Sequence, residues 1–79
     1  MITILYTITK EKDLIFAQPV NYTTKGEAEA ILNDIHNDLK YNDYIKNIKY
    51  STNVLEFTDT REGETDEIHK FEIIEKGGE

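Results

Sequence analysis

The chain of 79 residues contains no cysteine, no tryptophan and only one proline, and these absences exclude several classes of protein. Without cysteine there is no disulfide framework, no thiolate metal ligand and no thiol nucleophile. The four glycines form no glycine-rich loop and no Gly-Lys-Ser/Thr sequence follows them, which excludes the common phosphate-binding motifs. A small domain without disulfide bonds must be stabilised by the packing of its side chains alone.

Long apolar runs and an excess of basic residues are also lacking. No segment approaches the run of about 20 apolar residues that spans a membrane, and the first residues have none of the features of a signal peptide. We therefore expect a cytoplasmic protein. With 16 acidic and 9 basic residues the formal charge is −7, which disfavours direct binding to nucleic acid or to a membrane and favours a basic partner.

The composition is otherwise that of a globular protein, with 38% hydrophobic residues, five tyrosines and three phenylalanines. Isoleucines and Tyr6 alternate with threonines at the start of the chain, which predicts a strand near 1–9. Alternation resumes over 14–20, so the first 21 residues are predicted to form a β-hairpin. Pro19 would place its second strand at an edge of the sheet, because proline donates no ladder hydrogen bond.

A capping box predicts where the next element begins. Thr24 and Glu27 have the S/T-x-x-E spacing in which each side chain bonds the backbone of the other residue. Behind this cap the apolar residues recur at helical spacing, and we expect a helix over about 25–41. The residues of this apolar stripe are Ala28, Ile31, Leu32, Ile35 and Leu39.

Short groups of β-forming residues follow and predict strands near 46–50, 53–58 and 68–75, with a frayed tail at 76–79. The alternation changes phase across 51–53, which requires either a turn or a bulge there. We predict a single α+β domain over 1–79, with a four- to five-stranded antiparallel sheet and the helix packed on one face. One helix leaves the other face of the sheet solvated or bound to a partner.

No pattern in the sequence predicts an enzyme, a cofactor or a metal site. The only serine is Ser51, and the two histidines, His36 and His69, lie on separate elements without the spacing of a zinc motif. We expect both histidines at the surface or at its rim. The acidic connector fails the EF-hand pattern, because threonines occupy its first and third ligand positions and His69 occupies the twelfth.

Most of the negative charge lies near the end of the sequence. Residues 1–55 contain seven acids and six bases, whereas residues 56–79 contain nine acids and three bases. A dense acidic segment of this kind steers encounter with a basic surface, although a solvated hairpin loop has the same composition. The candidate partner-binding residues lie in the 59–67 connector and are Asp59, Glu62, Glu64, Asp66 and Glu67.

In size and composition alone, a short acidic domain without catalytic motifs resembles small bacteriophage or mobile-element proteins that inhibit host enzymes, such as anti-CRISPR proteins and DNA-mimic inhibitors. The resemblance implies a non-enzymatic inhibitor that docks its acidic surface onto the basic groove of a host nucleic-acid-binding protein or nuclease. The alternative is a homo-oligomeric structural or regulatory module, such as a homodimer, that pairs through a sheet face or edge.

Overall fold

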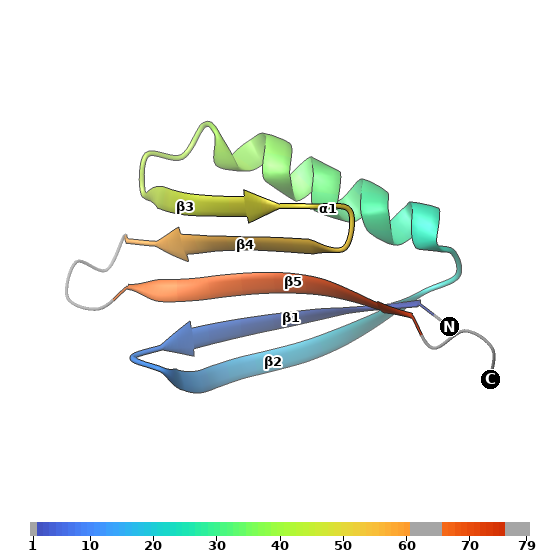
Figure 1. Cartoon of the computed structure of the whole chain (residues 1–79), viewed down its shortest axis with the longest axis horizontal. Coiled ribbons are helices and arrows are strands. Elements are labelled where there is room, and N and C mark those ends of the chain that lie inside the picture. The colour runs from blue at the N-terminus through green and yellow to red at the C-terminus, as the bar shows by residue number, and fades with distance from the viewer. Residues whose placement is uncertain (1, 61–65, 76–79) are drawn as a thin grey trace.

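The computed structural model describes residues 2–60 and 66–75, which form one five-stranded antiparallel sheet and one helix (Figure 1). The predicted α+β class is confirmed, with the larger of the two expected strand numbers. The helix ends two residues before its predicted limit of 41, and the expected tail at 76–79 lies outside the described residues. In chain order the elements are β1 Ile2–Lys10, β2 Asp13–Tyr22, α1 Lys25–Leu39, β3 Ile45–Tyr50, β4 Val54–Asp59 and β5 Glu67–Glu75.

The strands are arranged in the order β2-β1-β5-β4-β3, so the first and last strands of the chain pair in the middle of the sheet. The registers align one residue from each strand in a row near one end of the sheet. This row runs through Asp13, Lys10, Glu67, Asp59 and Ile45. The β1–β2 turn, the α1–β3 loop and both described ends of the 59–67 connector therefore lie at the same end of the molecule (Figure 1).

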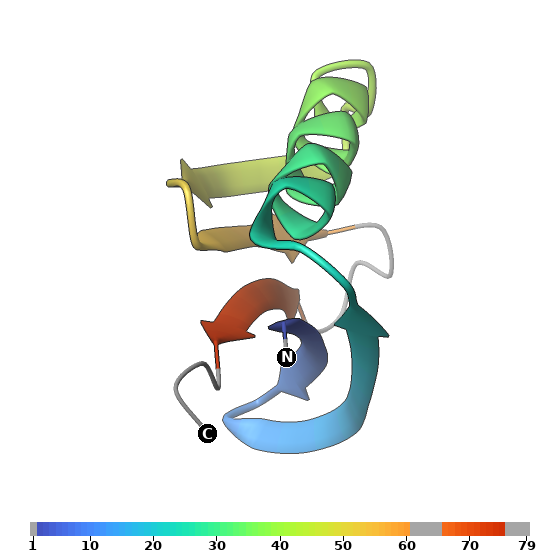
Figure 2. The same ribbon diagram turned by 90° about the vertical axis from the view of Figure 1, so that its right-hand side faces the viewer.

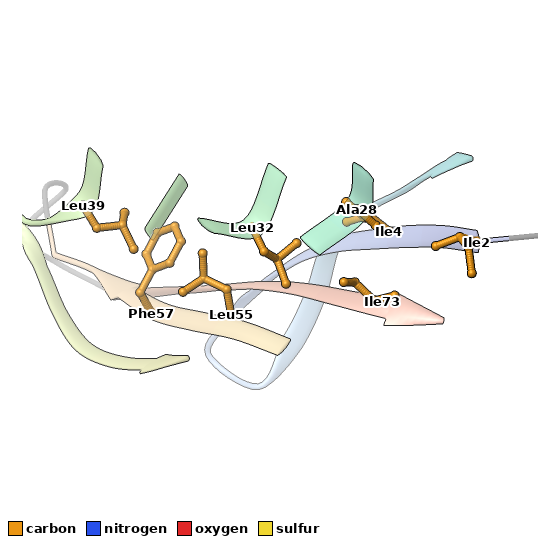
Figure 3. Packing of buried hydrophobic residues seen from close by; sticks show 8 residues of the cluster. All are labelled: Ile2, Ile4, Ala28, Leu32, Leu39, Leu55, Phe57 and Ile73. Atoms are coloured by element: carbon orange, nitrogen blue, oxygen red, sulfur yellow. The ribbon is translucent and has the colours of Figure 1, made fainter. Parts of the chain in front are cut away.

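The hydrophobic core lies between α1 and one face of the sheet, and strand alternation determines which residues enter it. Ile4 pairs with Ile73 across β1 and β5, while Leu55 on β4 meets the same face. Leu32 of α1 and Leu55 are fully buried at the centre of this contact. Figure 3 shows the eight buried hydrophobic residues, which are Ile2, Ile4, Ala28, Leu32, Leu39, Leu55, Phe57 and Ile73.

The predicted capping box is present at the start of α1. The Thr24 hydroxyl oxygen accepts a hydrogen bond from the Glu27 amide at 3.2 Å, and Glu27 Oε1 accepts one from the Thr24 amide at 3.1 Å. Both amides would otherwise lack a helical partner. The cap directs the chain out of β2 and positions the apolar stripe of α1 over the sheet.

Replacing the cap gives a direct test of this local structure. Thr24→Ala is expected to lower the free energy of unfolding by about 1 kcal/mol, because it leaves the Glu27 amide without its acceptor. Urea unfolding followed by circular dichroism measures the difference, with Thr23→Ala as the control because Thr23 is also exposed and lies outside the capping box. Equal losses in the two variants would contradict a stabilising role for the cap.

The choice between a turn and a bulge at 51–53 is resolved in favour of a turn. The Ser51 amide donates to the Val54 carbonyl at 2.8 Å and reverses the chain between β3 and β4. A bulge is also present, but it lies earlier, between Lys46 and Lys49 of β3. Asn47 has a φ of 56° there, a left-handed conformation that asparagine tolerates better than most residues.

The second face of the sheet carries no helix within the described residues, and the shortest dimension of the molecule is only 15 Å. Leu5, Val54 and Ile74 alternate with core residues and lie half-buried on this face. Seen end-on, α1 lies above β4 while the β1–β2 hairpin curves away beneath it (Figure 2). No helix within the described ranges is long and apolar enough to cross a membrane.

Candidate functional site

The structure divides the predicted partner-binding acids into different environments. Asp66 is exposed at the start of β5, Glu67 is half-buried, and Asp59 is buried with only 5% of its surface exposed. Glu62 and Glu64 lie outside the described residues. Among the three described acids, only Asp66 therefore offers a fully accessible carboxylate to a partner.

Asp59 and Glu67 meet His69 in a cluster near the end of β4 and the start of β5. Asp59 pairs directly with Glu67 across the two strands, and His69 lies two residues further along β5 on the same face. One potential ligand atom from each residue lies within 4.8 Å of the other two. His69 Nε2 is 3.2 Å from Glu67 Oε1. We call these three residues the Asp59–Glu67–His69 cluster.

The His69 ring contacts two neighbouring side chains, Tyr6 and Phe57. Its Nδ1 lies 2.6 Å from the Tyr6 hydroxyl on β1, and its plane stacks on Phe57 with the ring centroids 5.1 Å apart. Tyr6 itself stacks on Phe71 at 4.3 Å. Only 12% of the His69 side chain is exposed, which places it at the rim of the core, one of the two positions expected from the sequence. Strand alternation places His69 on the same face as Phe71.

The charges of the Asp59–Glu67–His69 cluster affect the pKa of Tyr6. Burial raises the pKa of the Tyr6 hydroxyl above its ordinary value of 10.0, and the charges of Glu67 and Asp59 raise this pKa further. Tyr6 therefore remains a neutral hydroxyl at physiological pH, able to donate or to accept a hydrogen bond. In the simplest arrangement it donates to His69 Nδ1, while the Nε2 proton of His69 points to Glu67.

A hydroxyl, an imidazole and a carboxylate in series also form the arrangement that activates a nucleophile in many hydrolases. Such chemistry needs a concave site where a substrate meets the hydroxyl. A shallow hollow of about 360 Å³ is present, but it lies on the opposite face of the sheet and does not open onto Tyr6. Its lining residues are Asn47, Ile48, Lys49, Glu56, Thr58 and Ile68.

The other histidine has a different environment. His36 on α1 stacks on Tyr50 of β3 with ring centroids 4.3 Å apart and is half-buried. It is not part of the Asp59–Glu67–His69 cluster. This contact helps to hold α1 against the edge strand β3, so a packing role accounts for it.

The remaining acids of β4 and β5 are compensated by lysines. Glu56 lies 4.0 Å from Lys49, and Glu75 lies 3.6 Å from Lys25. Within β5, Lys70 lies 3.7 Å from Glu72. These ion pairs are exposed enough that each contributes little to stability, but they cancel local charge. The net negative charge of the protein is therefore carried by residues other than these paired acids.

Three groups of described residues lie at one end of the sheet and carry most of the net charge, and we call them the acidic end. Residues 10–13 include two lysines and two acids, residues 38–43 include two aspartates and one lysine, and residues 59–60 and 66–67 include three acids. Together they account for −4 of the total charge of −7. The register row and Figure 1 show that these groups, distant in sequence, reach the same end.

No family model matches the chain, and no match was found among the curated proteins or the solved structures. The functional interpretation rests on the charge and chemistry of the residues themselves.

Proposed function

We propose that the protein is a non-enzymatic binding protein that docks its acidic end onto a basic surface of another protein. The observation that carries the proposal is the concentration of −4 of the net charge of −7 in three groups of described residues at one end of the sheet. Charge gathered in this way accelerates encounter with a basic partner and fixes its orientation.

Several carboxylates at the acidic end are accessible for direct bonds. Asp13, Asp43 and Asp66 are exposed, and none of them forms an ion pair with another residue in the described parts of the chain. Charge-assisted hydrogen bonds from arginine or lysine to such groups are stronger than bonds between neutral groups. Docking would therefore give these three carboxylates cationic partners.

Aromatic side chains accompany these acids. Tyr41 is 80% exposed and Tyr44 is 50% exposed, and both lie in the loop between α1 and β3. Tyrosine is enriched among the residues that contribute most to protein–protein affinity. The acidic end thus combines exposed carboxylates with apolar area, as an interface requires.

We place the partner among nucleic-acid-handling proteins, whose grooves carry the basic residues that bind phosphates. Carboxylates of the acidic end would occupy phosphate positions, and the protein would act as an inhibitor. This assignment predicts that duplex DNA displaces the protein from its partner. Binding that excess DNA leaves unchanged would place the partner in another class of basic protein.

A charge-matched pair of variants tests the proposal. The acidic-end variant carries Asp13→Asn, Asp43→Asn and Asp66→Asn, while the control carries Glu29→Gln, Asp34→Asn and Glu72→Gln. Each loses three charges, but the control acids lie on α1 and in the middle of β5. Partners are captured from cell extract with the wild-type protein, identified by mass spectrometry and purified for affinity measurements.

The acidic-end variant is expected to bind the captured partner about tenfold more weakly than the wild type, because each exposed ion pair contributes about 0.2–1 kcal/mol. The control variant should retain the wild-type affinity. Equal affinities of the two variants would contradict docking through the acidic end, whatever partner is captured.

A second candidate function, self-association, is favoured by the edge strand β2. Every residue from Asp13 to Asn21 is exposed, and four of them are large and apolar. An edge of this kind pairs readily with the same edge of a second copy. The exposed apolar residues of β2 are Leu14 at 62%, Ile15 at 53%, Phe16 at 41% and Val20 at 40%.

Sedimentation velocity tests this candidate. If β2 pairs between copies, the wild type should show a dimer that grows with concentration, and Ile15→Lys should give a monomer because it adds charge to the edge. Ala30→Lys is the control, since Ala30 is exposed on α1 away from β2. A wild-type monomer at every concentration would exclude self-association through this edge.

A further inference from the structure

The Asp59–Glu67–His69 cluster has the composition and spacing of a metal site, a role separate from the docking of the acidic end. We propose that it binds a divalent cation of the zinc type through the Asp59 and Glu67 carboxylates and His69 Nε2. Ligand atoms about 2.0–2.2 Å from a tetrahedral zinc lie about 3.3–3.6 Å apart. His69 Nε2 and Glu67 Oε1 are already 3.2 Å apart, and all three ligand atoms lie within 4.8 Å.

The donor set determines which cation fits. Imidazole together with carboxylates suits zinc and similar transition metals, whereas calcium and magnesium prefer six or more oxygen ligands. Three protein ligands leave a fourth position for water. Zinc is therefore the cation that these residues favour, and magnesium, a divalent cation that they do not favour, serves as the negative control.

The charges of the cluster also favour a cation. Asp59 and Glu67 stand directly opposite each other on neighbouring strands, an arrangement in which two like charges destabilise the sheet. Asp59 is buried, so water screens its charge poorly. A divalent cation between the two carboxylates would attract both of them. Lys10 of β1 stands opposite Glu67 in the strand register, and its long side chain can extend into solvent.

Tyr6 supplies the outer support that metal-bound histidines need. A ligating histidine almost always bonds a protein group through its other ring nitrogen, which fixes the orientation of the ring. Here that group is the Tyr6 hydroxyl, 2.6 Å from His69 Nδ1. Coordination uses the Nε2 lone pair, so the ring proton resides on Nδ1 in the bound state and Tyr6 becomes the acceptor. Phe57 keeps the plane of the ring in place through its stacking contact.

Such a cation would join the end of β4 to the start of β5. These two points are the described ends of the 59–67 connector, whose sequence contains five acids. Metal binding would therefore hold together the two ends of the 59–67 connector, which is proposed to meet a partner. Neither proposal requires the other, because partner binding and metal binding are measured separately.

The test uses chelator-treated full-length protein, followed by titration with zinc chloride and magnesium chloride. Zinc at a hundredfold excess over its dissociation constant should raise the midpoint of thermal unfolding by roughly 10–20 °C, given the size of the domain. Magnesium at the same concentration should leave the midpoint unchanged. A wild-type protein that zinc does not stabilise, or that magnesium stabilises equally, would overturn the proposal.

Variants assign the ligands. His69→Gln and Glu67→Gln are expected to abolish the zinc-dependent shift, whereas His36→Gln and Glu72→Gln should preserve it, because they remove the same groups outside the cluster. Tyr6→Phe should weaken zinc affinity by about 10- to 100-fold while leaving the three ligands in place. Full zinc affinity in His69→Gln, or its loss in His36→Gln, would overturn the assignment.

A spectroscopic measurement keeps the proposal testable if a ligand variant does not fold. Nitrogen-15 NMR of the wild-type histidine rings should show that zinc shifts the His69 Nε2 resonance and moves the ring proton to Nδ1. The His36 resonances should stay unchanged. A zinc-dependent change confined to His36, or no change in either ring, would contradict binding at the cluster.

Discussion

Leu32→Ala is expected to lower the free energy of unfolding by about 2–5 kcal/mol, because truncating a buried leucine loses apolar burial and leaves a cavity. Leu32 is fully buried where α1 meets the sheet, beside the equally buried Leu55 (Figure 3). A chain of this length has a total stability of about 4–12 kcal/mol. The variant should therefore lose a large part of its stability and its midpoint should fall accordingly.

Ile31→Ala is the control for this prediction. Ile31 is the neighbouring residue on α1, and 36% of it is exposed, so its truncation removes less buried area and leaves no enclosed cavity. Chemical unfolding monitored by circular dichroism gives both free energies. Equal losses in the two variants would show that α1 does not pack on the sheet through the face described.

Phe57→Ala is expected to lower the free energy of unfolding by about 3–5 kcal/mol, the second large effect. Phe57 is 7% exposed and belongs to the core, and its ring also stacks on His69. Its loss should remove one wall of the Asp59–Glu67–His69 cluster. The His69 ring resonances should therefore broaden or shift in the variant, in addition to the loss of stability.

Phe16→Ala provides the comparison for Phe57. Phe16 is 41% exposed on the edge strand β2 and contacts Tyr6 edge-to-face, with ring centroids 5.5 Å apart. Because the ring is partly solvated, its removal should cost less than the roughly 3–5 kcal/mol expected for a phenylalanine of the core. A cost as large as that of Phe57→Ala would mean that the β1–β2 hairpin forms a second core.

Local patterns in the sequence were sufficient to predict the elements of the fold. Alternation around Tyr6 specifies β1, the spacing of Thr24 and Glu27 specifies the start of α1, and the stripe that includes Leu32 specifies its buried face. Each of these signals depends on residues a few positions apart. The helix-on-sheet arrangement then follows, because the apolar faces have few other ways to be buried.

The Asp59–Glu67–His69 cluster was not predicted, because it depends on which strands become neighbours. The hydrogen bond between Tyr6 and His69 joins residues 63 positions apart, and it exists only because β1 lies beside β5. One part of the cluster could be predicted from the sequence. Glu67 and His69 alternate in phase with Phe71 and therefore lie on the face of the strand that meets the core. The pairing of Asp59 with Glu67 required the register of β4 and β5.

The distribution of charge over the molecule could also be predicted only in part from the sequence. The sequence shows the excess of acids after residue 56, but the ion pairs of Glu56 with Lys49 and of Glu75 with Lys25 depend on tertiary contacts. Similarly, segment 38–43 joins the acidic end only because α1 runs back along the sheet (Figure 1). The structure therefore moves the candidate interface from one connector to three segments.

The salt dependence of partner affinity tests the central claim of an acidic docking end most directly. The affinity of the captured partner is measured from low to high sodium chloride for the wild type, the acidic-end variant and the charge-matched control. Docking through the acidic end predicts a steep loss of affinity with salt in the wild type and the control, and a shallower loss in the acidic-end variant. Identical salt dependence in all three proteins would contradict it.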